Sequence, residues 1–114
     1  MDEPGRLFVY GTLVSAELVR ELVGKSFPRK PGVLPDYEKV SPRRGYPYVV
    51  ARPGGRVEGV VLFGVDAESL RIFDRYEGEG HLYERRVLPV LVEGRSLPCS
   101  VYVGRPEVLS RLWG

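Results

Sequence analysis

The stretch of sequence that decides the fold is Leu7-Phe8-Val9-Tyr10-Gly11-Thr12-Leu13, close to the start of the 114-residue chain. Its first four residues form a short, continuous apolar run, which predicts a strand buried on both faces. Gly11 breaks this run, and apolar residues then recur at helical spacing from Ser15 to Gly24. Ser15 is the expected N-cap of this helix and Gly24 the residue that closes it. The chain therefore begins as a buried strand that turns into a helix.

Residues 26–65 carry a mixed signal. The stretch Ser26–Arg56 is rich in proline, glycine and arginine and is the least regular third of the chain. It contains two short strand-like runs, at residues 33–40 and 48–51. A strong, mostly apolar strand is predicted at residues 57–65, in which two glycines mark bulges or close backbone approach, Gly59 and Gly64.

A second helix is predicted from Ala67 to about Tyr76, because Asp66 is a favourable N-cap and apolar residues recur along one face. The side chains expected to face the core are those of Leu70, Ile72 and Phe73. A glycine-broken loop at residues 78–82 follows, and its histidine, His81, is expected to be exposed.

The last third of the chain predicts a β-hairpin. Its strands are expected at residues 85–92 and 96–103, joined by the turn Glu93-Gly94-Arg95. Pro89 and Pro98 place parts of these strands at an edge or a bulge, because a proline removes a donor from the hydrogen-bond ladder.

The fold class follows from this inventory. Strand patterns dominate, accompanied by two clear helices and a last helical turn from Pro106 through Leu112. We predict one α+β domain over residues 1–114, built on a small, mixed, barrel-like antiparallel β-sheet with two to three short helices. The length suits a single core, and 43% hydrophobic residues are typical of a globular protein.

The composition excludes several kinds of chemistry. Cys99 is the only cysteine, so no disulfide can form within the chain. Because His81 is likewise the only histidine, a Cys/His zinc site is excluded, and we predict neither a metal nor a cofactor. Cys99 is expected to be a small buried residue and not a nucleophile.

Charge and hydropathy also limit which partners the protein can bind and where in the cell it is expected. The net charge is +2 and the arginines are interleaved with acidic residues, so we expect no nucleic-acid binding. No apolar run approaches the ~20 residues that a membrane span needs. Met1–Pro4 lacks the features of a signal peptide and a lone cysteine fits a reducing compartment, which together predict a cytoplasmic protein. The oligomeric state is left open.

The amino-acid composition also carries information about the source of the chain. Asparagine and glutamine are absent and ten prolines are present, a pattern that indicates a heat-adapted protein. A GC-rich coding bias gives the same pattern, because 14 of the 17 basic residues are arginine. Both interpretations stay open.

The junction at Gly11 is one candidate site. A strand that breaks at a glycine just before a helix leaves several backbone N–H groups pointing the same way, assisted by the helix dipole. Such a junction can seat a carboxylate or an oxyanion. The competing interpretation is an ordinary connection whose glycine relieves a tight turn, with Thr12 capping the helix.

Glu77 is a second candidate, at the end of an apolar-faced helix and beside the aromatic Tyr76. Partial desolvation and a place at the helix C-terminus both raise the pKa of a carboxyl group, which suits a general base. The competing interpretation is a solvated glutamate paired with Arg75 or Arg85. For Tyr83, contact with a ligand and simple packing are equally open.

Together these segments resemble the γ-glutamylcyclotransferase-like family, which includes AIG2-like and YtfP-like proteins. The residues that carry the resemblance follow one another in order along nearly the whole chain. They are Val9–Leu13, Gly45–Val50, Val57–Val60, Leu70–Val87 and Val101–Val103. The fourth of these stretches contains Asp74-Arg75-Tyr76-Glu77-Gly78 and the pair Tyr83 and Arg85.

This resemblance implies a small mixed barrel with a substrate cavity at its mouth. It implies that Glu77 is the acid/base of an intramolecular cyclisation that releases 5-oxoproline from a γ-glutamyl amine or amino acid. The γ-glutamyl group would be held largely by backbone amides, and no cofactor is needed. The residues implied to bind this small-molecule substrate are Tyr10, Gly11, Thr12 and Leu13, with Tyr83 as a further candidate.

The alternative function is a non-catalytic binding module that keeps the same cavity for an anionic metabolite. Glu77 discriminates between the two, because the enzyme needs this carboxylate whereas a pocket for an anion is better without it. Its presence favours the enzyme.

Overall fold

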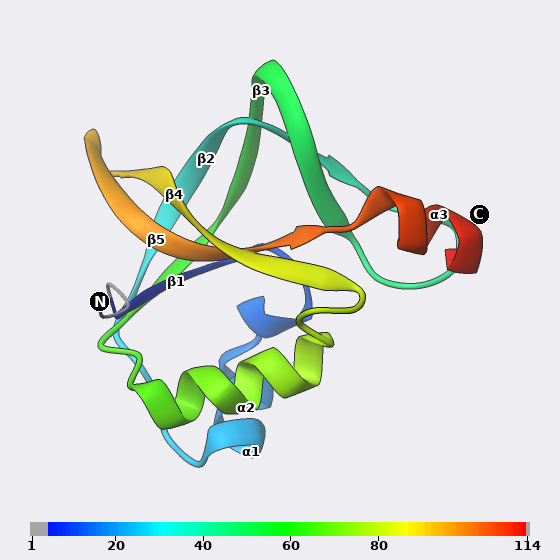
Figure 1. Ribbon diagram of the computed structural model, residues 1–114. Coiled ribbons are helices and arrows are strands. Elements are labelled where there is room, and N and C mark those ends of the chain that lie inside the picture. Colours follow the sequence, from blue (N-terminus) through cyan, green and yellow to red (C-terminus); the bar gives the residue numbers. More distant parts are fainter. Residues whose placement is uncertain (1–4, 114) are drawn as a thin grey trace.

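The structure, a computed structural model, describes residues 5–113 of the chain. In chain order the elements are β1 (Arg6–Val9), η1, a short 3-10 helix (Thr12–Val14), α1 (Ala16–Val23), β2 (Arg29–Val40), β3 (Tyr48–Phe63), α2 (Ala67–Glu77), β4 (Tyr83–Val92), β5 (Arg95–Gly104) and α3 (Pro106–Trp113) (Figure 1). Within this range every helix is too short or too polar to span a membrane. The prediction based on Met1–Pro4 lies outside the described residues.

The five strands close into a barrel in the order β1-β3-β2-β4-β5. Neighbouring strands are antiparallel except β1 and β5, which run parallel through the pairs Leu7–Ser100 and Phe8–Val101. The predicted α+β fold with a mixed, barrel-like sheet and short helices is therefore confirmed. The parallel pair is the exception to the expected antiparallel sheet, and it is the pair that closes the barrel.

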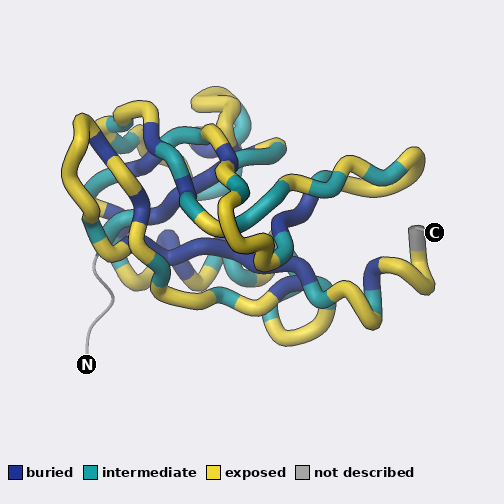
Figure 2. The backbone as a smooth tube through the Cα atoms, turned by 90° about the horizontal axis from the view of Figure 1, so that it is seen from above, coloured by how far each residue is buried: buried dark blue, intermediate teal, exposed yellow. Residues whose placement is uncertain are grey.

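β1 is buried on both faces, as its apolar run predicts. The side chain of Phe8 joins the cluster that fills the barrel, together with Val61 and Val101. Leu7 and Val9 point the other way and pack in a second cluster with residues of α1 and α2. The first cluster fills the barrel, and the second fills the space between the barrel and the two helices α1 and α2, which lie side by side against one side of it (Figure 1). In Figure 2 the dark blue, buried positions lie in the body of the molecule, whereas its outer loops are mostly yellow, exposed positions.

The predicted caps of the first two helices are confirmed. The Ser15 hydroxyl accepts a hydrogen bond from the Leu18 N–H at 3.1 Å, and Gly24 ends α1 in the left-handed conformation with φ 77°. The Asp66 carboxylate accepts the Ser69 N–H at 3.1 Å at the start of α2. Capping residues satisfy backbone groups that a helix end leaves unpaired, so these boundaries are encoded locally.

The prediction that Ser26–Arg56 is the least regular part of the chain is wrong. These residues form most of a long hairpin, in which β2 and β3 pair from Arg29–Leu62 to Val40–Tyr48. The two strand-like runs and the strand predicted at residues 57–65 are parts of these two strands, and the last of them ends at Phe63. The prolines and glycines mark a bulge within the hairpin, since the pairing register shifts around Asp36.

Two smaller predictions also need correction. On α2, Leu70 and Phe73 are buried as expected, but Ile72 is only partly buried and Ser69 takes the third buried position. Ser69 tolerates burial because its hydroxyl donates to the Asp66 carboxylate at 2.8 Å. In the second hairpin the turn contains Glu93 and Gly94 alone, both with positive φ, because Arg95 already pairs with Val92 in β5.

The remaining expectations for the carboxyl-terminal third hold. Pro89 and Pro98 face each other across the β4–β5 hairpin, away from the residues through which β4 pairs with β2 and β5 with β1. Helix α3 begins at Pro106, where the missing proline N–H costs no helical hydrogen bond. Leu109 of α3 is fully buried, whereas Leu112 is exposed.

Candidate active site

A small pocket lies where β1 runs into η1, facing the end of α2. Its volume is about 30 Å³, which is room for one or two water molecules. The pocket is rich in tyrosine and contains one carboxylate, that of Glu77. Its lining residues are Phe8, Val9, Tyr10, Gly11, Thr12, Leu13, Tyr46, Pro47, Tyr76, Glu77, Tyr83 and Tyr102. The structure thus brings all six candidate residues, 10–13, 77 and 83, around one cavity.

The backbone at Gly11 differs from the simple strand–helix junction that we expected. The 3-10 helix η1 intervenes, and the helical dipole of α1 starts only after Ser15. The first helical hydrogen bond of η1 runs from the Val14 N–H to the Gly11 carbonyl at 3.1 Å. The N–H groups of Thr12 and Leu13 precede that bond, so they are the donors that this turn offers to the pocket.

Thr12 does not cap a helix, in contrast to one of the interpretations above. Its hydroxyl lies 2.9 Å from the Tyr76 hydroxyl, and either oxygen can be the donor. Because Thr12 belongs to η1 and Tyr76 to α2, this hydrogen bond joins the two sides of the pocket.

Glu77 is the last residue of α2, and Gly78 ends the helix after it with φ 70°. Burial of the carboxyl group raises its pKa from 4.5 to about 7. The expected alternative partner, Arg85, donates instead to both oxygens of Asp74, at 2.8 and 3.2 Å. Among residues 5–113 the Glu77 carboxylate has no hydrogen bond or ion pair. It is a poorly solvated acid facing an aromatic pocket.

Three tyrosines surround this carboxylate, two of them buried and Tyr10 partly buried, and desolvation is the main cause that raises the pKa of each phenol. The negative charge of Glu77 contributes in the same direction for all three, Tyr10, Tyr83 and Tyr102. Their hydroxyls therefore stay protonated and act as hydrogen-bond donors at neutral pH.

Each of these hydroxyls donates to a defined acceptor. Tyr10 donates to the backbone carbonyl of Tyr102, and Tyr102 donates to the Asp74 carboxylate at 2.6 Å. The Tyr83 hydroxyl donates to the Pro47 carbonyl at 3.1 Å and so holds the segment that precedes β3 against the pocket. The oxygen of Tyr83 can still accept a hydrogen bond from a ligand.

Several functional candidates were missed in the sequence. Tyr46 and Pro47 come from the stretch that was expected to be irregular, and the hairpin brings them to the pocket. Tyr102 lies within Val101–Val103, one of the stretches that carry the resemblance, but the sequence assigned it no role. Asp74 had a usable signal, because residues three apart on a helix share a face and Glu77 follows at that spacing.

The other reactive side chains lie elsewhere. His81 is exposed in the loop after α2, as predicted. Cys99 is buried in the barrel, where desolvation raises the pKa of its thiol, in agreement with its prediction as a packing residue.

Because its pKa is higher in the folded chain than in the unfolded chain, Glu77 should make stability pH-dependent. The folded state binds more protons between pH 4.5 and about 7, so stability contributed at this site falls as the pH rises through that range. The full pKa difference corresponds to ~3 kcal/mol, and partial exposure should reduce the effect to about 1–2 kcal/mol. Glu77→Gln should therefore be more stable than wild type at pH 8 and similar at pH 5 in urea unfolding. An equal difference at both pH values would contradict this result.

The fold and the site together define a small closed-barrel protein with a partly buried carboxylate in a tyrosine-lined pocket where β1 runs into η1. A profile of the family described as "Gamma-glutamyl cyclotransferase, AIG2-like" matches residues 7–113. The chain is 33% identical over 91 residues to AIG2-like protein D of Arabidopsis thaliana, covering 79% of this chain and 59% of the relative. The chain therefore belongs to the γ-glutamyl cyclotransferase, AIG2-like family.

Solved structures agree with this assignment. The crystal structure of an AIG2-like protein from Mus musculus superposes with a TM-score of 0.75 at 26% identity, covering 95% of this chain and 84% of that one. A structure titled "Gamma-glutamyl cyclotransferase" shares the fold, with a TM-score of 0.76 at 19% identity over 88% of this chain and 66% of that chain. The chain spans between about half and two thirds of the length of the curated relatives it matches.

Proposed function

We propose that this chain is a γ-glutamyl cyclotransferase that releases 5-oxoproline from a γ-glutamyl amine or amino acid. Glu77 is the general acid/base, and Tyr10, Gly11, Thr12 and Leu13 hold the γ-glutamyl group. The observation that carries the proposal is the Glu77 carboxyl group, with a pKa raised by burial to about 7, in one pocket with the backbone of residues 11–13. Membership of the family supports the same reaction class.

The reaction is an intramolecular acyl transfer. Ionised Glu77 removes a proton from the α-amino group of the substrate, whose nitrogen then attacks the γ-carbonyl carbon. The tetrahedral intermediate collapses, the bond to the leaving nitrogen breaks, and the proton on Glu77 passes to that nitrogen. The five-membered lactam and a free amine leave, and no water is consumed. A base with a pKa near the working pH suits both proton transfers.

The oxyanion of the intermediate needs donors that are in place before the reaction starts. The N–H groups of Thr12 and Leu13 meet this need, because they precede the first helical hydrogen bond of η1. The remaining gain comes from folding the substrate so that its amine sits near its own carbonyl, which is an effect of orientation. A tyrosine-lined pocket restricts the substrate in that way.

The pocket must widen before it admits a γ-glutamyl group, since its volume is about 30 Å³. Tyr46 and Pro47 form one wall, and Tyr46 is 59% exposed. The hydrogen bond from Tyr83 to the Pro47 carbonyl is one contact that holds this wall in place. Tyr83 thus joins the moving wall to the acid/base side of the pocket.

Replacing Tyr83 by phenylalanine should lower kcat/KM by about 10–100-fold, because the Tyr83 oxygen can then no longer accept a hydrogen bond from the reacting amino group of the substrate, and this loss outweighs any easier opening of the wall. The loss of its bond to Pro47 should lower the free energy of unfolding by only ~1 kcal/mol. Steady-state kinetics and urea unfolding check the two values. Tyr37→Phe, which alters a tyrosine outside this pocket, is the matched control. Unchanged kinetics in Tyr83→Phe would show that Tyr83 packs against its neighbours and that its hydroxyl does not bind the substrate.

The binding-module alternative has less support. None of the residues that line the pocket is basic, so no side-chain cation there would hold an anion, and Glu77 would repel it. The test is 5-oxoproline release from a panel of γ-glutamyl amines and amino acids. Release from at least one compound supports the enzyme. Calorimetric binding of a γ-glutamyl compound without any release would favour the binding module.

A further inference from the structure

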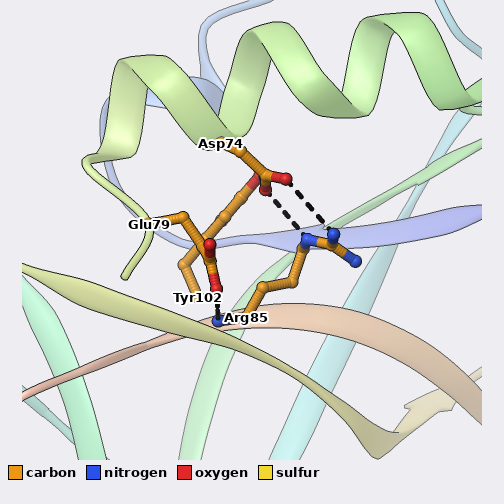
Figure 3. Close-up of polar contacts among 4 residues, drawn as sticks. All are labelled: Asp74, Glu79, Arg85 and Tyr102. Atoms are coloured by element: carbon orange, nitrogen blue, oxygen red, sulfur yellow. Dashed lines mark hydrogen bonds and ion pairs between the residues drawn. The ribbon is translucent and has the colours of Figure 1, made fainter. Parts of the chain in front are cut away.

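One turn of α2 before Glu77, three side chains from three elements meet. Arg85 of β4 donates to both oxygens of Asp74, at 2.8 and 3.2 Å, and Tyr102 of β5 donates to Asp74 at 2.6 Å (Figure 3). The side chains of Arg85 and Asp74 are 20% and 21% exposed. Figure 3 shows Asp74 reaching down from the helix to the two strands. Such a two-pronged, half-buried pair is stronger than a surface ion pair.

The geometry links this cluster to the acid/base residue. Asp74 and Glu77 are three residues apart, so they lie on the same face of α2. Tyr102 touches both features, because its hydroxyl binds Asp74 while its side chain lines the Glu77 pocket. Fastening Asp74 to β4 and β5 therefore fixes the last turn of the helix, from which Glu77 projects.

Several titratable and charged groups lie around Glu77. The groups that face Glu77 from other parts of the chain are phenols: Tyr83 from β4, Tyr102 from β5, Tyr10 from the residue after β1 and Tyr46 from the loop before β3. The helix that carries Glu77 also contributes Asp74, Arg75 and Tyr76. Glu79 follows in the loop, where its carboxylate accepts a hydrogen bond from the backbone N–H of Arg85 at 3.4 Å. Arg85 reaches this end of α2 through its bonds to Asp74, and Arg105, which follows β5, donates to the Gly80 carbonyl at 2.8 Å in the loop after the helix.

We propose that Asp74 and Arg85 act together as a charge-neutral clamp, two positioning residues that fix the end of α2 and screen Glu77 from the guanidinium charge. The inference rests on the proposed function of Glu77. The clamp has a consequence that simple packing lacks. Removing Asp74 or Arg85 changes the net charge at this end of α2 by one unit, and the two single substitutions change it in opposite directions.

The test is the titration of Glu77 in three variants, followed by carbon NMR of side-chain carboxyl groups, with Glu77→Gln used to assign the signal. Asp74→Asn should lower the titration midpoint by about one pH unit, because the Arg85 charge then stabilises ionised Glu77. Arg85→Gln should raise the midpoint by a similar amount, because Asp74 then repels it. The double variant should return close to wild type, although its stability should not.

Two further measurements keep the test decisive. Arg85→Lys keeps the charge and should leave the midpoint near wild type while losing the two-pronged geometry. The acidic limb of the kcat/KM profile should move in the same direction as each midpoint. Single variants that shift the midpoint in the same direction, or not at all, would overturn the clamp. Asp74→Asn is isosteric, so it gives a reading even if Arg85→Gln does not fold.

The NMR titration needs no catalysis, so the clamp and the proposed function fail separately. Absence of 5-oxoproline release with opposite midpoint shifts would reject the cyclotransferase and leave the charge balance standing. Release of 5-oxoproline with unchanged titration midpoints would reject the clamp and leave the cyclotransferase standing.

Discussion

Glu77→Gln should lower the rate of 5-oxoproline release by about 10²–10⁴-fold, the usual contribution of a general acid/base. Glutamine keeps the size and polarity of the side chain but cannot take the α-amino proton or return one to the leaving amine. The loss should appear in kcat, because the binding contacts of residues 10–13 remain. Steady-state release of 5-oxoproline by wild type and variant, at pH 6 to 9, measures the effect.

The matched control is Glu84→Gln, which removes an exposed carboxylate from β4 outside the pocket. Its activity should equal that of wild type. The Glu77→Gln protein should be folded, because the substitution removes a poorly solvated charge. Release that survives in a folded Glu77→Gln variant would contradict the acid/base assignment and leave the pocket without its proposed base.

The wild-type pH profile follows from the same group. With a pKa of about 7, Glu77 is ionised above neutral pH, so kcat/KM should rise through pH 6–8 as the base forms. A solvated glutamate would give a rise near its ordinary value of 4.5 instead. The position of this acidic limb therefore reports whether the carboxylate is buried in solution as it is in the structure.

Gly59→Ala should be the most damaging small substitution in the barrel, costing about 3 kcal/mol or more and lowering Tm by over ~10 °C. A Cβ atom at this position would meet the Val9 carbonyl oxygen and lie 2.7 Å from Cζ of Phe8. Neither can give way, because Val9 pairs with Val60 in the β1–β3 ladder and Phe8 is fully buried. Thermal and urea unfolding measure the loss.

Gly54→Ala provides the comparison for this prediction. Gly54 has nothing within 4 Å of an added Cβ, and its cost comes only from its φ of 82°. That cost should be about 1 kcal/mol. An equal loss of unfolding free energy in the two variants would show that the close contacts of Gly59 with Val9 and Phe8 do not limit the stability of the barrel. The shift at Gly59 should also distort the strand that leads into the Tyr10–Leu13 segment.

The features that the sequence predicted correctly depend on neighbours along the chain. The buried run of β1, the Ser15 and Asp66 caps and the left-handed Gly24 are each encoded within one turn or one strand. The placement of Glu77 at the end of an apolar-faced helix belongs to the same class. These local signals sufficed for the α+β barrel class and for the two segments that line the pocket.

The features that the sequence did not predict depend on residues far apart in the chain. Continuity of β2 and β3 through the Pro- and Gly-rich stretch comes from their mutual pairing, which lets a bulge at Asp36 absorb the irregular residues. By sequence Arg85 was a possible partner of Glu77, but in the folded chain its guanidinium pairs with Asp74 at 2.8 Å.

What the sequence by itself determined was the kind of elements, their caps and the acid that faces the pocket. Only the tertiary structure decided the strength of that acid and its surroundings. The pKa of Glu77 is raised because strands β1, β4 and β5 exclude water around it, and burial is a property of the assembled barrel. A carboxylate acquires the character of a base near neutral pH from what packs against it, and no local pattern records that packing.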